Sequence, residues 1–94
     1  PRIPFGLLIE RGILKPGEIL FDVRKRFFAK VRIDGSLISD KSKGSIHSVG
    51  AEVQGLSACN GWTFWHTNLN GTVVNIDSLR NLFKEKYKDF LAVT

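Results

Sequence analysis

The stretch "ACNGWTFWH", residues 58–66, holds both tryptophans of the chain, its single cysteine and one of its two histidines. We read "WTFWH" as a β-strand, in which Trp62, Phe64 and His66 alternate with Thr63 and Trp65, so the two tryptophans point to opposite faces. One face of a strand in a small domain packs on the core and the other meets solvent. We therefore expect one tryptophan in the core and the other at least partly exposed, where it would mark a contact surface. The alternative is that helices cover both rings.

Hydrophobic spacing on either side of this stretch predicts the remaining elements. We expect helices over residues 3–12, 45–56 and about 77–92, and strands over 19–23, 27–33, 36–39, 62–66 and 72–76. Asp34-Gly35 and residues 68–71 are typical of hairpin turns. This order predicts an α+β fold, a single domain with a small antiparallel sheet of about five short strands and three helices.

Several residues have a specific expected place in this fold. Phe27, Ala29, Val31 and Ile33 alternate along their strand and should share its buried face. The second helix should bury a stripe of Ile46, Val49, Val53 and Leu56, and it should end in a turn at Asn60-Gly61. Gly50 lies inside this helix, where glycine costs about 1 kcal/mol relative to alanine, so it suggests close packing against another element. Asp77 is a good N-cap for the last helix.

Composition limits the classes of partner. The chain of 94 residues has a net charge of +5 and a pI near 9.7, which favours attraction to polyanions such as nucleic acid. No apolar run approaches the roughly 18 residues that a membrane span needs, so we expect no membrane partner. One cysteine cannot form an internal disulfide, which favours a reducing compartment such as the cytoplasm. Because the chain opens on Pro1 rather than methionine, we expect a piece of a longer protein.

Basic residues gather in two segments. Lys41 and Lys43 of "KSKGSIH", residues 41–47, precede a predicted helix N-terminus, where backbone N–H groups and the helix dipole attract anions. The Ser45 hydroxyl could cap this helix or bond a phosphate, and the sequence leaves both readings open. A second basic group, Arg24, Lys25 and Arg26, lies in a turn between strands and is either simply solvated or part of the same patch.

Two further features concern a specific partner and catalysis. Arg80 lies in the first turn of the final helix, where a cation opposes the helix dipole, so local stability does not explain it. Cys59 with His47 or His66 could form a nucleophile and base, but no third orienting group is evident. These residues also lack the spacing of metal ligands, so neither catalysis nor a metal site is expected in this chain.

Three segments in order resemble the RAMA domain, which is named for its association with restriction-type adenine methylases. They are "PFGLLIERGILKPGEIL" (residues 4–20), "GSIHSVGAEVQGLSACNGWTFWH" (44–66) and "IDSLR" (76–80). The resemblance covers most of residues 2–80. It is nearest to the C-terminal domain of cell-cycle-regulated bacterial DNA adenine-N6 methyltransferases, which methylate GANTC sites. Those enzymes also have a catalytic domain with a DPPY motif, and this chain contains no such motif.

The resemblance implies a non-catalytic DNA-binding and target-recognition module of a site-specific DNA adenine-N6 methyltransferase, located in the cytoplasm at the nucleoid. It implies double-stranded DNA, opened locally if the enzyme extrudes its adenine, the enzyme's own catalytic domain and a second copy of the full-length enzyme as partners. No cofactor is expected in this fragment, and S-adenosylmethionine is expected for the full-length enzyme. The motif residues implied to contact DNA are Ser45, His47, Asn60, Trp62, Thr63, Trp65 and Arg80, with attraction added by Lys41, Lys43, Arg24, Lys25 and Arg26.

Two other functions stay open. The aromatic surface could instead dock on the catalytic domain or mediate dimerisation, which would make the chain a protein-interaction module. A reader of modified DNA is a third alternative, because RAMA-like domains also occur fused to other enzyme types.

Overall fold

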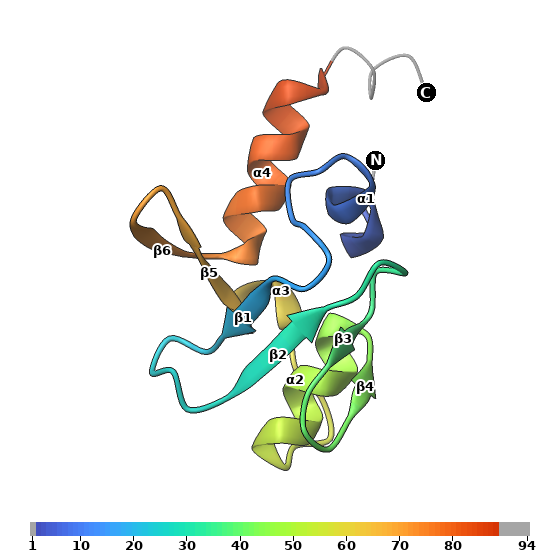
Figure 1. Cartoon of the computed structure of the whole chain (residues 1–94), viewed down its shortest axis with the longest axis vertical. Helices are drawn as coiled ribbons and strands as arrows, with labels where there is room; N and C mark the ends of the chain where they lie inside the picture. The colour runs from blue at the N-terminus through green and yellow to red at the C-terminus, as the bar shows by residue number, and fades with distance from the viewer. Residues whose placement is uncertain (1, 89–94) are drawn as a thin grey trace.

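The computed structural model describes residues 2–88, and an antiparallel sheet with the strand order β4-β3-β2-β1-β5-β6 runs through it (Figure 1). The α+β class and the antiparallel sheet are confirmed, and the described residues form one more strand and one more helix than expected. The strands are β1 (Ile19–Phe21), β2 (Phe28–Val31), β3 (Leu37–Ile38), β4 (Lys43–Gly44), β5 (His66–Leu69) and β6 (Thr72–Asn75). The helices are α1 (Phe5–Glu10), α2 (Ile46–Gln54), α3 (Gly61–Phe64) and α4 (Ile76–Lys86).

The structure differs most from the predicted fold in residues 58–66. Residues Gly61–Phe64 form the helical turn α3 instead of a strand, and β5 begins only at His66. The Asn60 side chain caps this turn, because its Oδ1 accepts a hydrogen bond from the Trp62 backbone N–H at 3.1 Å. Trp62 is 8 % exposed and Trp65 is 0 % exposed, so the expectation of one exposed tryptophan is wrong. Both rings are covered.

Helix α2 begins where the sequence predicted and ends earlier. Ser45 is its N-cap, with Oγ accepting from the Ser48 backbone N–H at 3.0 Å. Gly55, in the left-handed conformation, ends the helix in place of the expected turn at Asn60-Gly61. Leu56 therefore lies beyond the helix and is exposed instead of completing the buried stripe.

The close packing expected at Gly50 is confirmed. A side-chain carbon on Gly50 would lie 2.9 Å from the Cys59 sulfur and 3.3 Å from the Phe64 ring. Since real side chains avoid such distances, glycine lets α2 lie directly against the 58–66 segment.

The strand and hairpin predictions are confirmed in part. Ala29 and Val31 are buried as expected, but Phe27 is half-buried and Ile33 is 82 % exposed, because both lie outside the short strand β2. The two hairpin turns form at the expected places, with positive φ at Gly35 and at Asn70 and Gly71. The polar segment 40–44, expected to be a loop, contributes β4, which pairs with β3.

Helix α4 begins at Ile76 with Asn75 as its N-cap, because the Asn75 side chain accepts from the Ser78 backbone N–H at 3.1 Å. Asp77 therefore lies inside the first turn and is not the N-cap that we expected. The helix extends to Lys86. The predicted continuation over residues 89–92 lies outside the described residues.

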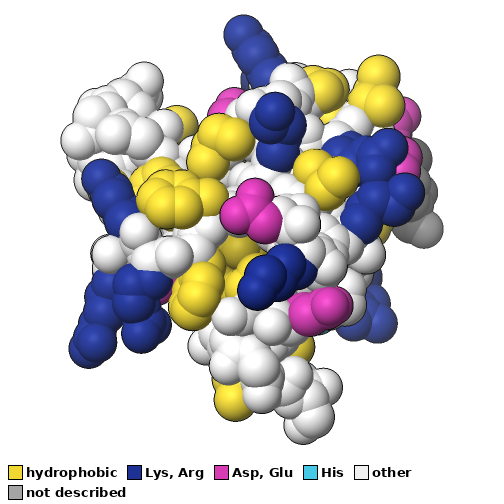
Figure 2. Space-filling view, turned by 60° about the horizontal axis from the view of Figure 1, so that its bottom comes forward, with side chains coloured by type: hydrophobic (Ala, Val, Ile, Leu, Met, Phe, Trp, Pro, Cys, Tyr) yellow, Lys and Arg dark blue, Asp and Glu magenta, His cyan; other side chains and the backbone are white. Residues whose placement is uncertain are grey.

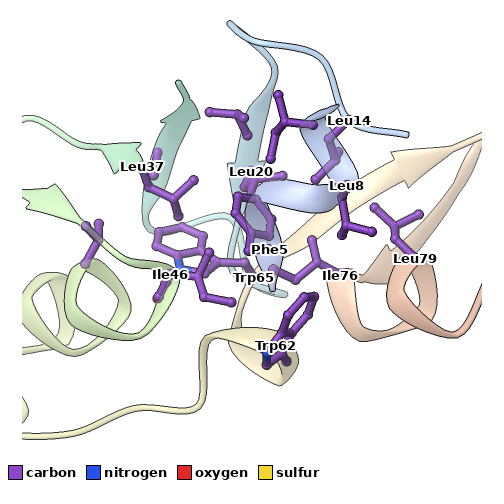
Figure 3. Close-up of a cluster of buried hydrophobic side chains, with 14 of the residues drawn as sticks. Phe5, Leu8, Leu14, Leu20, Leu37, Ile46, Trp62, Trp65, Ile76 and Leu79 are labelled. Carbon is purple, nitrogen blue, oxygen red and sulfur yellow. Dashed lines mark hydrogen bonds between the residues drawn. The ribbon is translucent and has the colours of Figure 1, made fainter. Parts of the chain in front are cut away.

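The core is centred on Trp65. In Figure 3 the Trp65 ring lies among Leu37, Ile46, Leu20 and Phe5, which come from the sheet, α2 and α1. Its indole Nε1 donates to the Ile46 carbonyl at 3.0 Å, so its polar atom has a partner within the core. One side chain therefore joins three elements.

Candidate nucleic-acid interface

Two parts of the 44–66 motif meet in space, because the start of α2 lies against the start of α3. The Gly61 backbone N–H donates to His47 Nδ1 at 2.9 Å. A side-chain carbon on Gly61 would lie 2.5 Å from the carbonyl atoms of Ile46, so no other residue fits this approach. Because Nδ1 accepts this hydrogen bond, Nε2 is the ring nitrogen of His47 that carries a proton. His47 is exposed and can donate from Nε2 to a ligand.

A groove of about 710 Å³ opens beside Trp62. Its apolar floor includes Phe5 and Trp62. An adjoining hollow of about 640 Å³ shares several of these residues and adds Asn60. We call the two together the Trp62 groove. Their polar and charged lining comprises Arg2, Ser45, His47, Asn60, Arg80 and Lys84. No Asp or Glu of residues 2–88 lines either hollow, so the groove suits an anionic ligand.

Arg80 has two local partners, which corrects the expectation that local stability does not explain it. Its Nη2 forms an ion pair with Asp77, three residues earlier on the same helix. Its guanidinium carbon lies 4.3 Å from the centroid of the Trp62 ring, a cation–π contact. Arg80 Nε is buried and has no hydrogen-bond partner within residues 2–88. The guanidinium is thus held in one place while part of its donor capacity is unused.

The Trp62 ring lies beneath the Arg80 guanidinium and packs in turn against Phe5. It makes an edge-to-face contact with Phe5, at a centroid separation of 6.0 Å. Arg80 lies over the ring, which leaves Trp62 little free surface on which a base could stack. The geometry makes Trp62 a platform for the arginine.

Asn60 and Ser45 place polar groups at the edge of the groove. The Asn60 carbonyl oxygen is used by the Trp62 N–H, so its amide Nδ2 can donate outward. Ser45 Oγ caps α2 and also donates to Ser48 Oγ at 3.1 Å. The capping role of Ser45 is therefore shown, and Ser45 also lines the groove.

Other predicted contact residues lie outside the Trp62 groove. Trp65 is fully buried, so it can touch no ligand in this fold, and its place in the predicted contact set is wrong. Thr63 is exposed but does not line the groove, and its hydroxyl donates to the Asn60 carbonyl at 3.2 Å. Arg26 and Lys41 line a separate hollow between the β1–β2 turn and the end of α2.

The remaining basic residues are distributed over other parts of the surface. Arg24 and Lys25 lie in the β1–β2 turn, and Lys43 lies in β4. Arg26 is bound to Asp22 through an ion pair of 3.2 Å. On the face drawn in Figure 2, Lys and Arg side chains form separate groups, with hydrophobic and acidic side chains between them. The chain therefore has more than one basic area.

The groove includes two cations that the sequence analysis missed, Arg2 and Lys84. Lys84 follows Arg80 by one helical turn, and that spacing places both on one face of α4, so it could have been found. Arg2 reaches the groove only because the chain before α1 runs past it, and no local signal predicts this.

The geometry does not favour a cysteine nucleophile. Cys59 packs against Gly50, and its sulfur accepts from Gln54 Nε2 at 3.5 Å. Burial raises the pKa of the Cys59 thiol, which disfavours the reactive thiolate. The His47 Nδ1 is used by Gly61, and His66 Nδ1 donates to the Phe64 carbonyl at 2.9 Å.

Neither a cluster of metal ligands nor a membrane-spanning helix occurs within residues 2–88. Within residues 2–88, no three His, Cys, Asp or Glu side chains come together as a metal site would require. No helix in the same range has both the length and the apolar character to cross a membrane.

The fold and the groove define a small α+β domain with a basic groove on its surface. The chain belongs to the RAMA family, "Restriction Enzyme Adenine Methylase Associated", which it matches over residues 1–89. The family membership that the motifs suggested is thus confirmed. The chain is also similar to the Type II methyltransferase M.HinfI of Haemophilus influenzae, with 31% identity over 80 residues. The similar region covers 85% of this chain and 22% of that protein, so the chain spans about a fifth of the relative's length.

Proposed function

We propose that this chain is a non-catalytic DNA-binding and target-recognition module of a site-specific DNA adenine-N6 methyltransferase. Family membership and similarity to a Type II methyltransferase support this proposal. The observation that carries it is the Trp62 groove, where Ser45, His47, Asn60, Trp62 and Arg80 come together from three separate segments. Catalysis and S-adenosylmethionine binding belong to another domain of the full-length enzyme.

Arg80 is the main recognition residue in this proposal. Its guanidinium is fixed between Trp62 and Asp77, so little side-chain freedom is lost on binding. Nε of Arg80 is enclosed and Nη2 pairs with Asp77, so the remaining guanidinium nitrogen, Nη1, would donate to a phosphate oxygen or to an acceptor atom of guanine. Arg80 therefore combines affinity with geometric selectivity.

The other groove residues have complementary roles. Arg2 and Lys84 neutralise phosphates and release counterions. His47 Nε2–H and the Asn60 amide can donate to acceptor atoms on base edges. Lys41, Lys43 and the basic β1–β2 turn add sequence-independent attraction from other parts of the surface.

The proposal includes the finer expectations from the resemblance. The full-length enzyme is then of the cell-cycle-regulated kind that methylates GANTC sites, acts as a homodimer, and works in the cytoplasm at the nucleoid. Site preference of this chain in a binding assay is the first test of that specificity.

The second candidate function is a protein-interaction module that docks on the catalytic domain or mediates dimerisation. It is favoured by exposed apolar side chains on the sheet, such as Phe28, which is 52 % exposed. The salt dependence of binding distinguishes the two functions. Duplex binding should weaken with a log–log slope of about −0.9 for each neutralised phosphate, whereas an apolar interface should respond little.

The proposed function is tested by fluorescence anisotropy with a labelled duplex, with and without a GANTC site, at low and moderate salt. We expect salt-dependent binding that Arg80→Ala weakens by about tenfold or more, equivalent to roughly 1–3 kcal/mol per recognition contact. Lys15→Ala is the matched control, because it removes one positive charge outside the groove. Equal effects of the two variants, or no binding by the folded chain at low salt, would contradict the proposal.

A further inference from the structure

The sheet has a second face that carries exposed aromatic, aliphatic and basic side chains. Residues that pair across strands point to the same face of a sheet. One row pairs Ile19 with Lys30, Lys30 with Ile38, and Ile38 with Lys43, and these residues are all exposed. We call the face that carries this row the open sheet face.

A second row on the open sheet face is aromatic. Phe21 pairs with Phe28 on one side and with His66 on the other. Phe28 is largely exposed, and Phe21 is partly exposed. The side chains on the other face, Leu20, Ala29, Val31 and Leu37, are all buried in the core. Helix α2 packs on that inner side, against β3 and β4 (Figure 1).

The strands of the open sheet face carry positive charge, and among the described residues acidic side chains lie only at its edges. Asp34 interacts electrostatically with Lys43, and Asp40 and Glu52 line the hollow that Phe28 also lines. Within residues 2–88, the strand residues on this face include Lys30 and Lys43 but no Asp or Glu. Lys25, from the adjoining turn, places its ammonium 5.3 Å from the centroid of the Phe21 ring. A ligand of opposite charge would meet several cations together with flat apolar rings.

The two acidic residues that flank β1 are already bound within the domain. Glu18 accepts from the Thr67 hydroxyl at 3.2 Å. Asp22 accepts from the backbone N–H groups of Arg26 and Phe27 and forms the ion pair with the Arg26 side chain. They therefore neutralise none of Lys25, Lys30 and Lys43.

We propose that the open sheet face binds a stretch of unpaired nucleic acid. Bases stack on Phe28, while Lys25, Lys30 and Lys43 bind the phosphates. Single-strand recognition commonly combines such aromatic platforms with a basic surface, and stacking tolerates any base. The cluster of Lys25, Lys30 and Lys43 beside Phe28 favours this polyanion over an apolar protein partner. The inference goes beyond duplex binding in the Trp62 groove and does not depend on it.

The test compares binding of a labelled single strand of mixed sequence with binding of the labelled duplex. We expect Phe28→Ala to weaken single-strand binding by about tenfold and to leave duplex binding nearly unchanged. Arg80→Ala is the crossed control, and we expect it to weaken duplex binding while sparing the single strand. Lys30→Glu, at an exposed position, provides a second test if Phe28→Ala lowers the folded fraction.

Three outcomes would overturn this proposal. The folded chain could fail to bind the single strand at low salt, or Phe28→Ala and Lys30→Glu could both bind it like the unsubstituted chain. Sedimentation could instead show a dimer that Phe28→Ala dissociates, which would make the face an interface between copies. Duplex binding that persists in any of these cases would leave the function proposed for the Trp62 groove intact.

Discussion

Trp62 and Trp65 come from the same short segment, but the polar groups around them are used in different ways. Around Trp65, the indole N–H and the Ile46 carbonyl bond to each other inside the core. Around Trp62, Arg80 Nε has no partner within residues 2–88, and Asn60 and His47 keep outward donors. The difference teaches that tryptophan alone does not mark a binding surface. A binding surface is instead marked by polar groups beside the ring that have hydrogen bonds still to make.

The largest expected effect comes from Trp65→Ala, which should lower the free energy of unfolding by about 3–5 kcal/mol because it empties the centre of the core. Urea unfolding followed by circular dichroism measures this. A sharper comparison uses Trp65→Phe and Trp62→Phe. Only the first removes the hydrogen bond from the indole N–H to the Ile46 carbonyl, so it should cost about 0.5–1.5 kcal/mol more. Equal costs would show that the two environments do not differ as described.

Gly61→Ala should have the next largest effect, lowering the free energy of unfolding by about 1–3 kcal/mol. Its new methyl group would lie 2.5 Å from the Ile46 carbonyl, and the backbone there cannot move aside as a side chain could. Gly6→Ala is the matched control within α1, since its nearest neighbour would be 3.9 Å away. Alanine at that position should be neutral or slightly stabilising. A similar loss in both variants would contradict the close contact at Gly61.

Asp22 resembles Trp65 in this comparison, because its carboxylate makes its hydrogen bonds inside the domain. Burial raises the pKa of Asp22, but hydrogen bonds from the Phe27 and Arg26 backbone and the Arg26 guanidinium outweigh it, so the pKa lies below its usual 3.8. A lowered pKa stabilises the fold above the unfolded-state value, and the stabilisation is lost as the pH falls through the lower folded-state value. Asp22→Asn should cost about 1 kcal/mol at neutral pH. It should also flatten the loss of stability below about pH 4.

This prediction is measured by urea unfolding at pH 7 and at several values below pH 4. The unsubstituted chain and Asp22→Asn should converge at the acidic end. Parallel curves would show that the Asp22 interactions do not depend on its charge.

The smallest expected effect is that of Asp77→Asn on the proposed duplex binding. The ion pair with Arg80 is partly exposed and contributes little to stability, so the fold should be nearly unaffected. Loss of this positioning contact should weaken binding of the preferred duplex by about fivefold, or ~1 kcal/mol. Removal of a negative charge alone would strengthen attraction to DNA. A gain in affinity, measured by anisotropy, would therefore mean that Asp77 only neutralises Arg80.

The elements that were predicted well have strong local signals. Ser45 caps α2, and the turns at Asp34-Gly35 and Asn70-Gly71 fix their hairpins. The turn α3 was missed because five residues of alternating character fit a strand, and only the Asn60 cap distinguishes the helical turn. Part of the groove followed from the motifs, and Lys84 could have been added from its helical spacing to Arg80. The place of Arg2 followed from neither, because it depends on contacts between segments far apart in the sequence.

The hydrogen bonds that tie the 46–47 segment to the 61–65 segment also bear on how the chain folds. Their partners are 14 and 19 residues apart, a short loop to close. The pairing of Phe21 with His66 closes a much longer one. Since loop-closure entropy rises with length and non-local contacts slow folding, we expect the α2–α3 junction to form early and the β1–β5 pairing late. Mutations at Gly61 should then slow refolding, and mutations where β1 meets β5 should mainly speed unfolding. The part of the groove that α2 and α3 form would then be in place before the sheet is complete.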